Sequence, residues 1–245
     1  MLLAEQYQRV HLQLVHKWAG REISGLILKT DLFAEGISPS RAFLWDILKT
    51  GNHVVGTDIS SDIVMRAISN AGRIAPDAAL DGINSDLRKL PFADNSFDVI
   101  ISDSSLDHFR RKQDISTSIF ELSRVLKPGG KLIITLDNKH NLTEPLFRLW
   151  IWLKLSSFFI GKTMSLEELK QSLCNAGLQV TDTTAIMHNP RFFTKLVIKI
   201  IRRARGSKSD NTISRFLSFF DSLENTSTRL FTAQFIATRA VKPGN

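Results

Sequence analysis

"FDVIIS" at residues 97–102 and "KLIIT" at residues 131–135 decide the fold, because a helical pattern, "DISTSIFELSRVL" at 114–126, separates them. Two apolar runs around a helix predict a strand–helix–strand unit with a right-handed crossover and parallel strands. Their near-continuous apolar residues are typical of strands buried on both faces of a sheet. The turn "KPGG" leads into the second run, and its Gly129 and Gly130 permit dihedral angles that other residues avoid.

The same alternation of apolar runs and helical patterns continues on both sides of this unit. It predicts an α/β fold, in which helices cover both faces of a doubly wound, mainly parallel sheet. Helical patterns precede the unit at 39–51 and 61–72. Further strands are predicted at "GLILKTDLF" (25–33), "HVVGTDIS" (53–60), "AALDGINSD" (78–86), "LQVTDTTAIMH" (178–188) and "RLFTAQFIATRAV" (229–241).

Helix-end signals place the boundaries of two helices. Ser38 is a predicted N-cap with Pro39 at the first helical position, and Gly51 is a predicted C-terminal stop. Further along, "SLEELKQSLCNAG" begins with a capping box, in which Ser165 and Glu168 each satisfy a backbone N–H of the other.

The chain is predicted to comprise an N-terminal helix over residues 1–20 and one domain over residues 21–245. Apolar residues at helical spacing and a following glycine predict the first helix. Within the domain, residues 139–163 are less regular and rich in large apolar side chains, which favours a lid-like insertion. Residues 191–211 form a basic, amphipathic segment.

The composition indicates a globular protein of a reducing compartment. The chain has 245 residues, of which 43% are hydrophobic and 23% charged, and this suits one α/β domain. The single cysteine, Cys174, excludes an intrachain disulfide and a cysteine-rich metal site, so a cytoplasmic location is expected. The start lacks the charge order of a signal peptide. The most apolar stretch, residues 145–161, is too short and too charged to span a bilayer.

The net charge is +8 and the isoelectric point about 9.8, and much of the positive charge lies in residues 195–208. Without this cluster the chain is only mildly basic, which disfavours a nucleic-acid partner. Within residues 192–205, apolar and basic residues occupy different faces of a predicted helix. Two interpretations stay open: a peripheral contact with an anionic membrane, or, as in most such helices, packing on the protein's own domain.

Five predicted strands end in an acidic residue. In parallel sheets, ligands bind at the carboxyl ends of the strands, near the point where the strand order reverses. Acids at these ends are therefore candidates for the rim of a binding site. They are Asp31, Asp58, Asp86, Asp103 and Asp137.

Four segments, in their order and spacing, resemble the class I S-adenosylmethionine-dependent methyltransferases of the small-molecule type: "HVVGTDIS", "SDLRKLPFADNSFDVIIS", "LDHF" and "LSRVLKPGGKLIIT". The resemblance is close over residues 25–135 and looser beyond them. It implies a Rossmann-like methyltransferase fold with seven strands, the last of them antiparallel. It also implies that the cofactor is S-adenosylmethionine. The methyl acceptor would be a small organic molecule, and a lipophilic molecule is one option.

The resemblance assigns the nucleoside part of the cofactor to two strand ends. Asp58, with Ile59 beside it, would accept hydrogen bonds from the ribose hydroxyls, as the acid of dinucleotide-binding folds does. Asp86 would meet the adenine amino group, and the backbone N–H of Leu87 would meet the ring. From the residues alone, Asp58 can also be an acid at the start of a helix, and Asp86 an ordinary loop acid.

The loop after the first strand departs from the family's pattern, an acid followed by three glycines at alternate positions. This loop, at residues 29–39, has one glycine, Gly36. One interpretation is a wider loop, in which Thr30, Asp31 or Glu35 holds the positively charged amino group of the cofactor. Gly36 would then form a positive-φ turn. The other is a blocked site, in a protein that binds or scaffolds without reacting.

Candidate catalytic residues follow the fourth strand. Ser102 and Asp103 lie at its end, beside the transfer site that the resemblance implies. Where the acceptor loses a proton, His108 is the first candidate for the base, because its ordinary pKa lies near neutrality. A packed histidine is the alternative role for His108, and Asp103 and Asp107 are alternative bases. No metal-ligand set with suitable spacing occurs, and the strand end "SDSS" lacks the motifs of nucleic-acid base methylation.

Overall fold

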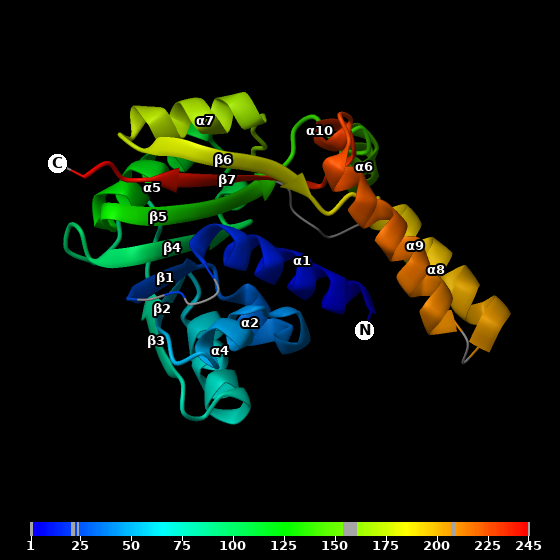
Figure 1. The fold of residues 1–245 in the computed structure, drawn as a ribbon, viewed down its shortest axis with the longest axis horizontal. Coiled ribbons are helices and arrows are strands. Elements are labelled where there is room, and N and C mark those ends of the chain that lie inside the picture. Colours follow the sequence, from blue (N-terminus) through cyan, green and yellow to red (C-terminus); the bar gives the residue numbers. More distant parts are fainter. Residues whose placement is uncertain (1, 21–22, 24, 154–160, 207–208, 245) are drawn as a thin grey trace.

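A seven-stranded sheet forms the centre of the computed structural model, which describes residues 2–20, 23, 25–153, 161–206 and 209–244 (Figure 1). Its strands are β1 (Leu26–Thr30), β2 (His53–Asp58), β3 (Ala79–Asn84), β4 (Phe97–Asp103), β5 (Leu126–Asp137), β6 (Gln179–Ile186) and β7 (Phe235–Val241). They lie in the order β3-β2-β1-β4-β5-β7-β6. β7 runs antiparallel between β5 and β6, and the other neighbouring strands pair in parallel. The predicted sheet is thereby confirmed.

Helices cover both faces of the sheet. One face carries α1 (Leu2–Ala19), α3 (Leu44–Leu48) and α4 (Ser61–Ile74), and the other carries α5 (Lys112–Val125) and α7 (Leu166–Asn175). Neighbouring residues of a strand point to opposite faces, so Ile27 packs with the first group of helices and Leu28 with the second. Because both faces are covered, the strands read as continuous apolar runs in the sequence.

The predicted helix ends are found in part. At α7 the hydroxyl of Ser165 accepts from the N–H of Glu168 (3.2 Å), and the carboxylate of Glu168 accepts from the N–H of Ser165 (2.7 Å), which confirms the capping box. Gly129 has a φ of 77°, as expected, but "KPGG" lies within β5 rather than before it. The N–H of Gly129 donates to the carbonyl of Lys242 (2.8 Å), so the chain end holds this turn in the strand.

The helix predicted over residues 39–51 is broken into a 3₁₀ turn, η1 (Pro39–Arg41), and α3. Pro39 occupies the first position as predicted, whereas Ser38 makes no side-chain capping bond. The indole N–H of Trp45 donates to the carbonyl of Pro39 (2.9 Å). The same carbonyl also accepts from the N–H of Ala42 (3.2 Å), so both bonds hold η1 against the start of α3.

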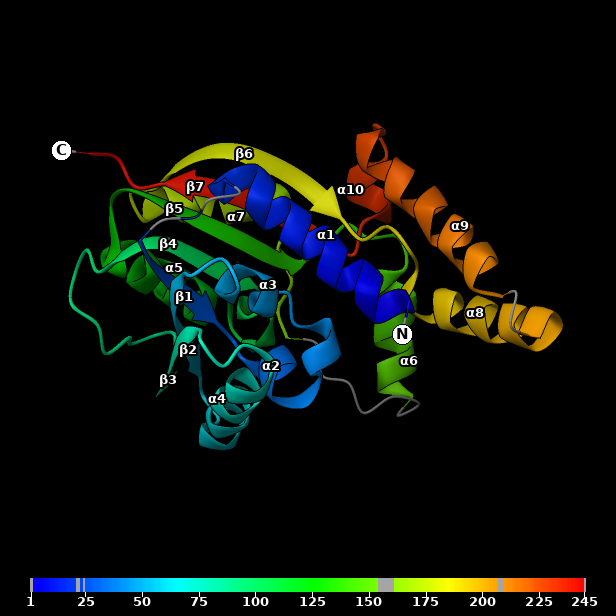
Figure 2. The ribbon, with the colours of Figure 1, turned by 60° about the horizontal axis from the view of Figure 1, so that its bottom comes forward.

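After β6 the chain leaves the sheet and forms a pair of helices, α8 (Arg191–Arg205) and α9 (Ser209–Asp221). The two helices lie side by side and extend away from the sheet (Figures 1 and 2). A 3₁₀ turn, η4 (Ser222–Asn225), and a short helix, α10 (Arg229–Thr232), lead back to β7. Residues 229–234 of the predicted last strand are thus helix and loop, and the strand begins at Phe235.

Candidate functional site

A cavity of about 610 Å³ opens at the carboxyl ends of β1, β2 and β3, next to the 3₁₀ turn η2 (Leu106–His108) that follows β4. This is the edge at which parallel sheets bind ligands, and the volume is in the range of small-molecule sites. The predicted site residues that line it are Asp31, Asp58, Ile59, Asp86, Leu87 and His108.

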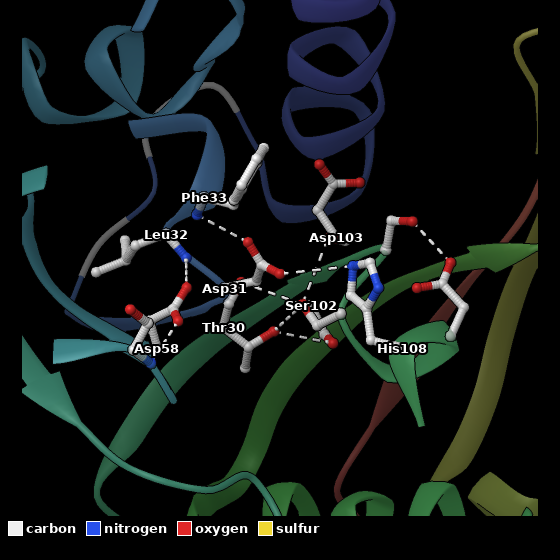
Figure 3. A network of polar contacts seen from close by, with 12 residues as sticks. Thr30, Asp31, Leu32, Phe33, Asp58, Ser102, Asp103 and His108 are labelled. Atoms are coloured by element: carbon white, nitrogen blue, oxygen red, sulfur yellow. Dashed lines mark hydrogen bonds and ion pairs between the residues drawn. The ribbon is translucent and has the colours of Figure 1, made fainter. Parts of the chain in front are cut away.

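Asp31 ends β1 in a left-handed conformation, with a φ of 64°. Its N–H donates to the carbonyl of Thr57 (2.8 Å), and its carboxylate accepts from the N–H of Phe33 (2.8 Å). Aspartate tolerates this conformation because its short side chain bonds to nearby backbone groups. The carboxylate lies 3.9 Å from Nε2 of His108 (Figure 3), and burial raises its pKa.

Asp58 approaches the same corner from the end of β2 (Figure 3). Oδ2 accepts from the N–H of Leu32 (3.0 Å), and Oδ1 accepts from the N–H of Ser60 (2.8 Å). A carboxylate offers about four lone-pair positions, so about two remain for hydroxyl groups in the cavity. Ser60 caps α4, which places Asp58 before the helix rather than within its first turn. The side chain of Ile59, on the cavity wall, is exposed.

Asp86 is held at the end of the cavity beside β3. Both of its carboxylate oxygens accept from the guanidinium of Arg88, at distances from 2.6 to 3.1 Å, and these hydrogen bonds lower its pKa. Arg88 also donates to Asp114 (3.2 Å) and lies over the ring of Phe109, 5.6 Å from its centroid. Asp86 is therefore an ionised, fixed acceptor next to Leu87.

The loop after β1 contains a short helix, α2 (Phe33–Ile37), instead of the predicted wide turn. Gly36 lies in this helix without a positive φ, and a Cβ there would lie 3.0 Å from the carbonyl oxygen of Ile63 in α4. The glycine thus permits close packing of α2 on α4, which corrects the predicted positive-φ turn. Glu35 lies outside the cavity, because its buried carboxylate is 3.3 Å from Nζ of Lys29.

The apolar residues of this loop leave the cavity open. Phe33 and Ile37 are exposed to solvent. Leu32 is buried against β2, where a Cβ on Gly56 would lie 2.6 Å from the Leu32 side chain. Gly56 therefore makes room for Leu32 beneath the loop, and none of the three side chains lines the cavity.

Thr30 and Ser102 lie beneath the cavity rather than in its wall. The hydroxyl of Thr30 donates to that of Ser102 (3.0 Å) and lies 2.7 Å from that of Ser105. Thr30 and Ser102 are fully buried, and among these three residues it is Ser105 that lines the cavity. The hydroxyl cluster joins the ends of β1 and β4, so Thr30 and Ser102 support the site from below.

His108 and Asp107 occupy contrasting environments although they are neighbours. The side chain of His108 is 55% exposed on the cavity wall. Asp107 is buried away from the cavity, where its Oδ2 accepts from the hydroxyl of Ser104 (2.7 Å) and from the N–H of Asp137 (3.0 Å). Burial and the charge of Asp137 raise the pKa of Asp107 to about 7. His108 is therefore the one of the two that a molecule in the cavity meets.

Asp103 is directed toward α1, on the other side of β4 from the cavity (Figure 3). It accepts from the hydroxyl of Tyr7 (3.0 Å) and from that of Thr135 (2.7 Å), and it lies 3.2 Å from Nε2 of His11. The roles of Tyr7 and His11 beside Asp103 have no signal in the sequence, because the apolar period of α1 does not indicate a partner 96 positions away.

The segment after α6 (Glu144–Trp152) returns onto the wall of the cavity. The N–H of Gly161 donates to the carbonyl of Asp107 (3.0 Å), and that of Lys162 to the carbonyl of Phe109 (2.8 Å). A Cβ on Gly161 would lie 2.3 Å from the Asp107 carbonyl oxygen, so this contact requires glycine. The end of the predicted lid is thus bonded to the cavity wall, while its residues 154–160 lie outside the described residues.

A comparison of sequences finds methyltransferases. Residues 38–134 match a family model described as a methyltransferase domain. Over 108 residues the chain is 36% identical to the 2-phytyl-1,4-naphtoquinone methyltransferase of Nostoc punctiforme, and the match covers 44% of this chain and 45% of that protein. The chain spans about half the length, or less, of the first curated relatives it matches.

Solved structures share the fold across almost the whole chain. The [4+2]-cyclase SpnF superposes with a TM-score of 0.64 at 20% identity, covering 97% of this chain and 82% of that one. A SAM-dependent methyltransferase from Methanosarcina mazei superposes with a TM-score of 0.63 at 17% identity, covering 95% and 98%. At these identities the likeness shows the fold.

Proposed function

We propose that the chain, in which residues 38–134 match a methyltransferase domain, transfers a methyl group from S-adenosylmethionine to a small, lipophilic organic acceptor. One observation carries the proposal: three strand ends place the carboxylates of Asp31, Asp58 and Asp86 around one cavity. The cofactor has hydroxyls on its sugar, an amino group on its base and an ammonium on its tail. The cavity offers an acceptor for each of these three groups.

The residues present fit the cofactor. Asp58 would hold the ribose hydroxyls with the lone-pair positions that its two backbone bonds leave unused. Asp86, fixed by Arg88, and the backbone of Leu87 would hold the adenine edge. Asp31 would pair with the ammonium, and that charge would favour its ionised form against the effect of burial. When bound, S-adenosylmethionine supplies a methyl group on a positively charged sulfur.

We assign the role of base to His108. Its ring lines the cavity and is half exposed, so a hydroxyl of the acceptor can reach it. A neutral ring nitrogen would take the proton of that hydroxyl as the aligned oxygen attacks the methyl group. Asp103 and Asp107 are not given this role, because Asp107 is buried, Asp103 bonds to Tyr7 of α1, and neither lines the cavity.

Two observations support a lipophilic acceptor. The Nostoc punctiforme relative is, by its name, a methyltransferase of a phytyl-substituted naphthoquinone. In this chain, α6 in the lid segment exposes large apolar side chains, with Leu146 67% and Trp152 76% accessible. Exposed apolar side chains gathered on one helix are typical of an interaction surface. They would cover an apolar molecule that enters above the cavity.

Calorimetric titration with S-adenosylmethionine and with its demethylated product, S-adenosylhomocysteine, tests the cofactor site. We expect micromolar binding, weakened about 10- to 100-fold in Asp58→Ala because hydrogen bonds to a charged group are lost. Asp62→Ala, an exposed acid on α4 paired with Arg66, is the matched control and should bind as the unaltered protein does. Absence of heat with both ligands at millimolar concentration would overturn the proposal.

A second function, binding or scaffolding without methyl transfer, is favoured by one observation. The loop after β1 forms the helix α2 and has side chains at positions where the family has glycines. Its backbone therefore cannot approach a ligand in the cavity as closely as a glycine-rich loop would. The cyclase neighbour, by its title, shows that this fold also serves another chemistry. Incubation with S-adenosylmethionine and quinol or phenol acceptors separates the two functions, because only the methyltransferase would form S-adenosylhomocysteine.

A further inference from the structure

Among the residues that the structure describes, one side of α8 packs within the protein. Ile198 is buried and Ile201 half-buried, and they join a small apolar cluster with Ile213 and Leu217 of α9 and Leu3 of α1. This cluster packs α8 and α9 against each other and against α1, although the pair extends away from the sheet (Figure 2). One of the two interpretations of the sequence, packing of this helix on the protein's own domain, therefore applies to one side of α8. Other described side chains of α8 are exposed to solvent.

The outer side of α8 carries an apolar ridge, formed by Phe193, Leu196 and Ile200. The spacing of three and then four residues places these side chains on one face of the helix. They are 56%, 55% and 56% exposed. Single exposed apolar residues are ordinary, but three large ones aligned on a projecting helix indicate a surface that another structure covers.

A basic ridge runs beside the apolar one. Lys195, Lys199 and Arg202 are spaced by four and then three residues, so they share the neighbouring face, and all three are exposed. The sequence of α8 contains no acidic residue that would neutralise them. Its basic residues are Arg191, Lys195, Lys199, Arg202, Arg203 and Arg205.

We propose that this face of α8 docks on an anionic lipid membrane. A helix with adjacent apolar and basic faces lies in the plane of a bilayer surface, where apolar side chains enter the acyl region and cations meet lipid headgroups. A nucleic acid would match the basic ridge but not the apolar one. A second copy of the chain would bring like charges together. None of the described helices is long and apolar enough to cross a bilayer, so α8 would bind at its surface.

Vesicle binding of the full chain, without cofactor or acceptor, tests this proposal separately from the enzymatic one. We expect sedimentation with vesicles of phosphatidylglycerol and phosphatidylcholine, weak binding to phosphatidylcholine alone, and loss of binding as salt rises. Lys195→Gln, Lys199→Gln and Arg202→Gln together should reduce the partition coefficient by on the order of 100-fold. The matched control changes three exposed cations elsewhere, Lys49, Arg66 and Lys170, to Gln and should change it less than about 3-fold.

The apolar ridge has its own test. Leu196→Gln with Ile200→Gln should weaken vesicle binding by about 10-fold or more, because two apolar side chains are no longer transferred from water into the lipid. Met65→Gln with Phe120→Gln, two exposed apolar residues on other helices, should not. The proposal is overturned by no binding to anionic vesicles at 50 mM salt, or by equal losses in the α8 and control variants. A dimer that dissociates in Leu196→Gln with Ile200→Gln, seen by light scattering, would also overturn it.

Discussion

The hydroxyl of Tyr7 donates a 3.0 Å hydrogen bond to the carboxylate of Asp103, which ties α1 to the carboxyl end of β4. His11, one turn further along α1, stacks on Tyr7 with the ring centroids 3.9 Å apart and lies 3.2 Å from the same carboxylate. Burial alone would raise the pKa of Asp103, but His11 and Lys29 hold it well below its usual range. The first helix is thus attached beside the site by a buried ionised group.

Tyr7→Phe should destabilise the protein by about 1.5–3 kcal/mol, because it removes a hydrogen bond to a charged group. Urea unfolding at pH 7 measures this, with Glu5→Gln, an exposed change on the same helix, as the control. Because the folded-state pKa of Asp103 is depressed, its contribution is present above the unfolded pKa of about 4 and is lost as the pH falls. An unchanged urea midpoint in Tyr7→Phe would show that this hydrogen bond contributes nothing to the attachment of α1.

Lys29→Met should destabilise the protein by about 3–5 kcal/mol, because it leaves the buried carboxylate of Glu35 without its partner. Burial already raises the pKa of Glu35, and Lys29 opposes that rise. In the variant, folding favours protonated Glu35, so stability should be greater at pH 5 than at pH 8. The double variant Lys29→Met with Glu35→Leu should recover most of the loss. Urea unfolding of Lys29→Met, Glu35→Leu and the double variant completes the cycle, and additive losses would argue against a direct pair.

Asp107→Asn should make stability less dependent on pH between about 4.5 and 7. The pKa of Asp107 is raised to about 7 in the folded state, so folding favours its protonated form. This contribution is complete below the unfolded pKa of about 4, falls by roughly 1.4 kcal/mol per pH unit between about 4 and 7, and changes little above the folded-state pKa. Thermal unfolding across this range tests the prediction. Parallel curves for the variant and the unaltered protein would show that Asp107 ionises freely.

Asp31→Asn should fold nearly as well as the unaltered protein, because asparagine tolerates the left-handed backbone at this position. It should still bind S-adenosylmethionine about 10-fold more weakly, since the ammonium of the cofactor loses a charged partner. Asp31→Ala should lose the same affinity and in addition about 1–2 kcal/mol of stability from the strained backbone. Calorimetry and urea unfolding measure the two effects. Equal cofactor affinity in all three proteins would remove Asp31 from the proposed site.

The individual strands and helices and the capping box of α7 could be predicted because their signals are local, whereas the seven strands with the last one antiparallel followed from the family resemblance. Apolar runs and helical periods identify the elements, and the position of Asp58 and Asp86 directly after a strand places both at the ligand edge. The rule that ligands bind at the carboxyl ends of parallel strands did not predict the orientation of Asp103, because the end of a strand also contacts the layer of helices. Which way a side chain turns there depends on a partner in α1.

The loop after β1 could not be predicted from its composition. A single glycine in a polar stretch suggested a turn, but Gly36 serves the packing of α2 on α4. Glu35 turns inward because Lys29 lies buried on β1, and a buried ion pair has no periodic signal in the sequence. The two ridges of α8 were visible as a pattern, whereas their exposure depends on how few residues of α9 and α1 cover the helix.

Ile186 and Phe235 are paired neighbours in the sheet, although the whole of residues 187–234 separates them along the chain. The helix pair is therefore an insertion between two strands that are already paired. A tight β-hairpin turn could connect the same two strands in the same register. Changes in the length or charge of this insertion would leave the register of every strand unchanged. The length and charge of residues 187–234 are therefore not constrained by the register of the sheet.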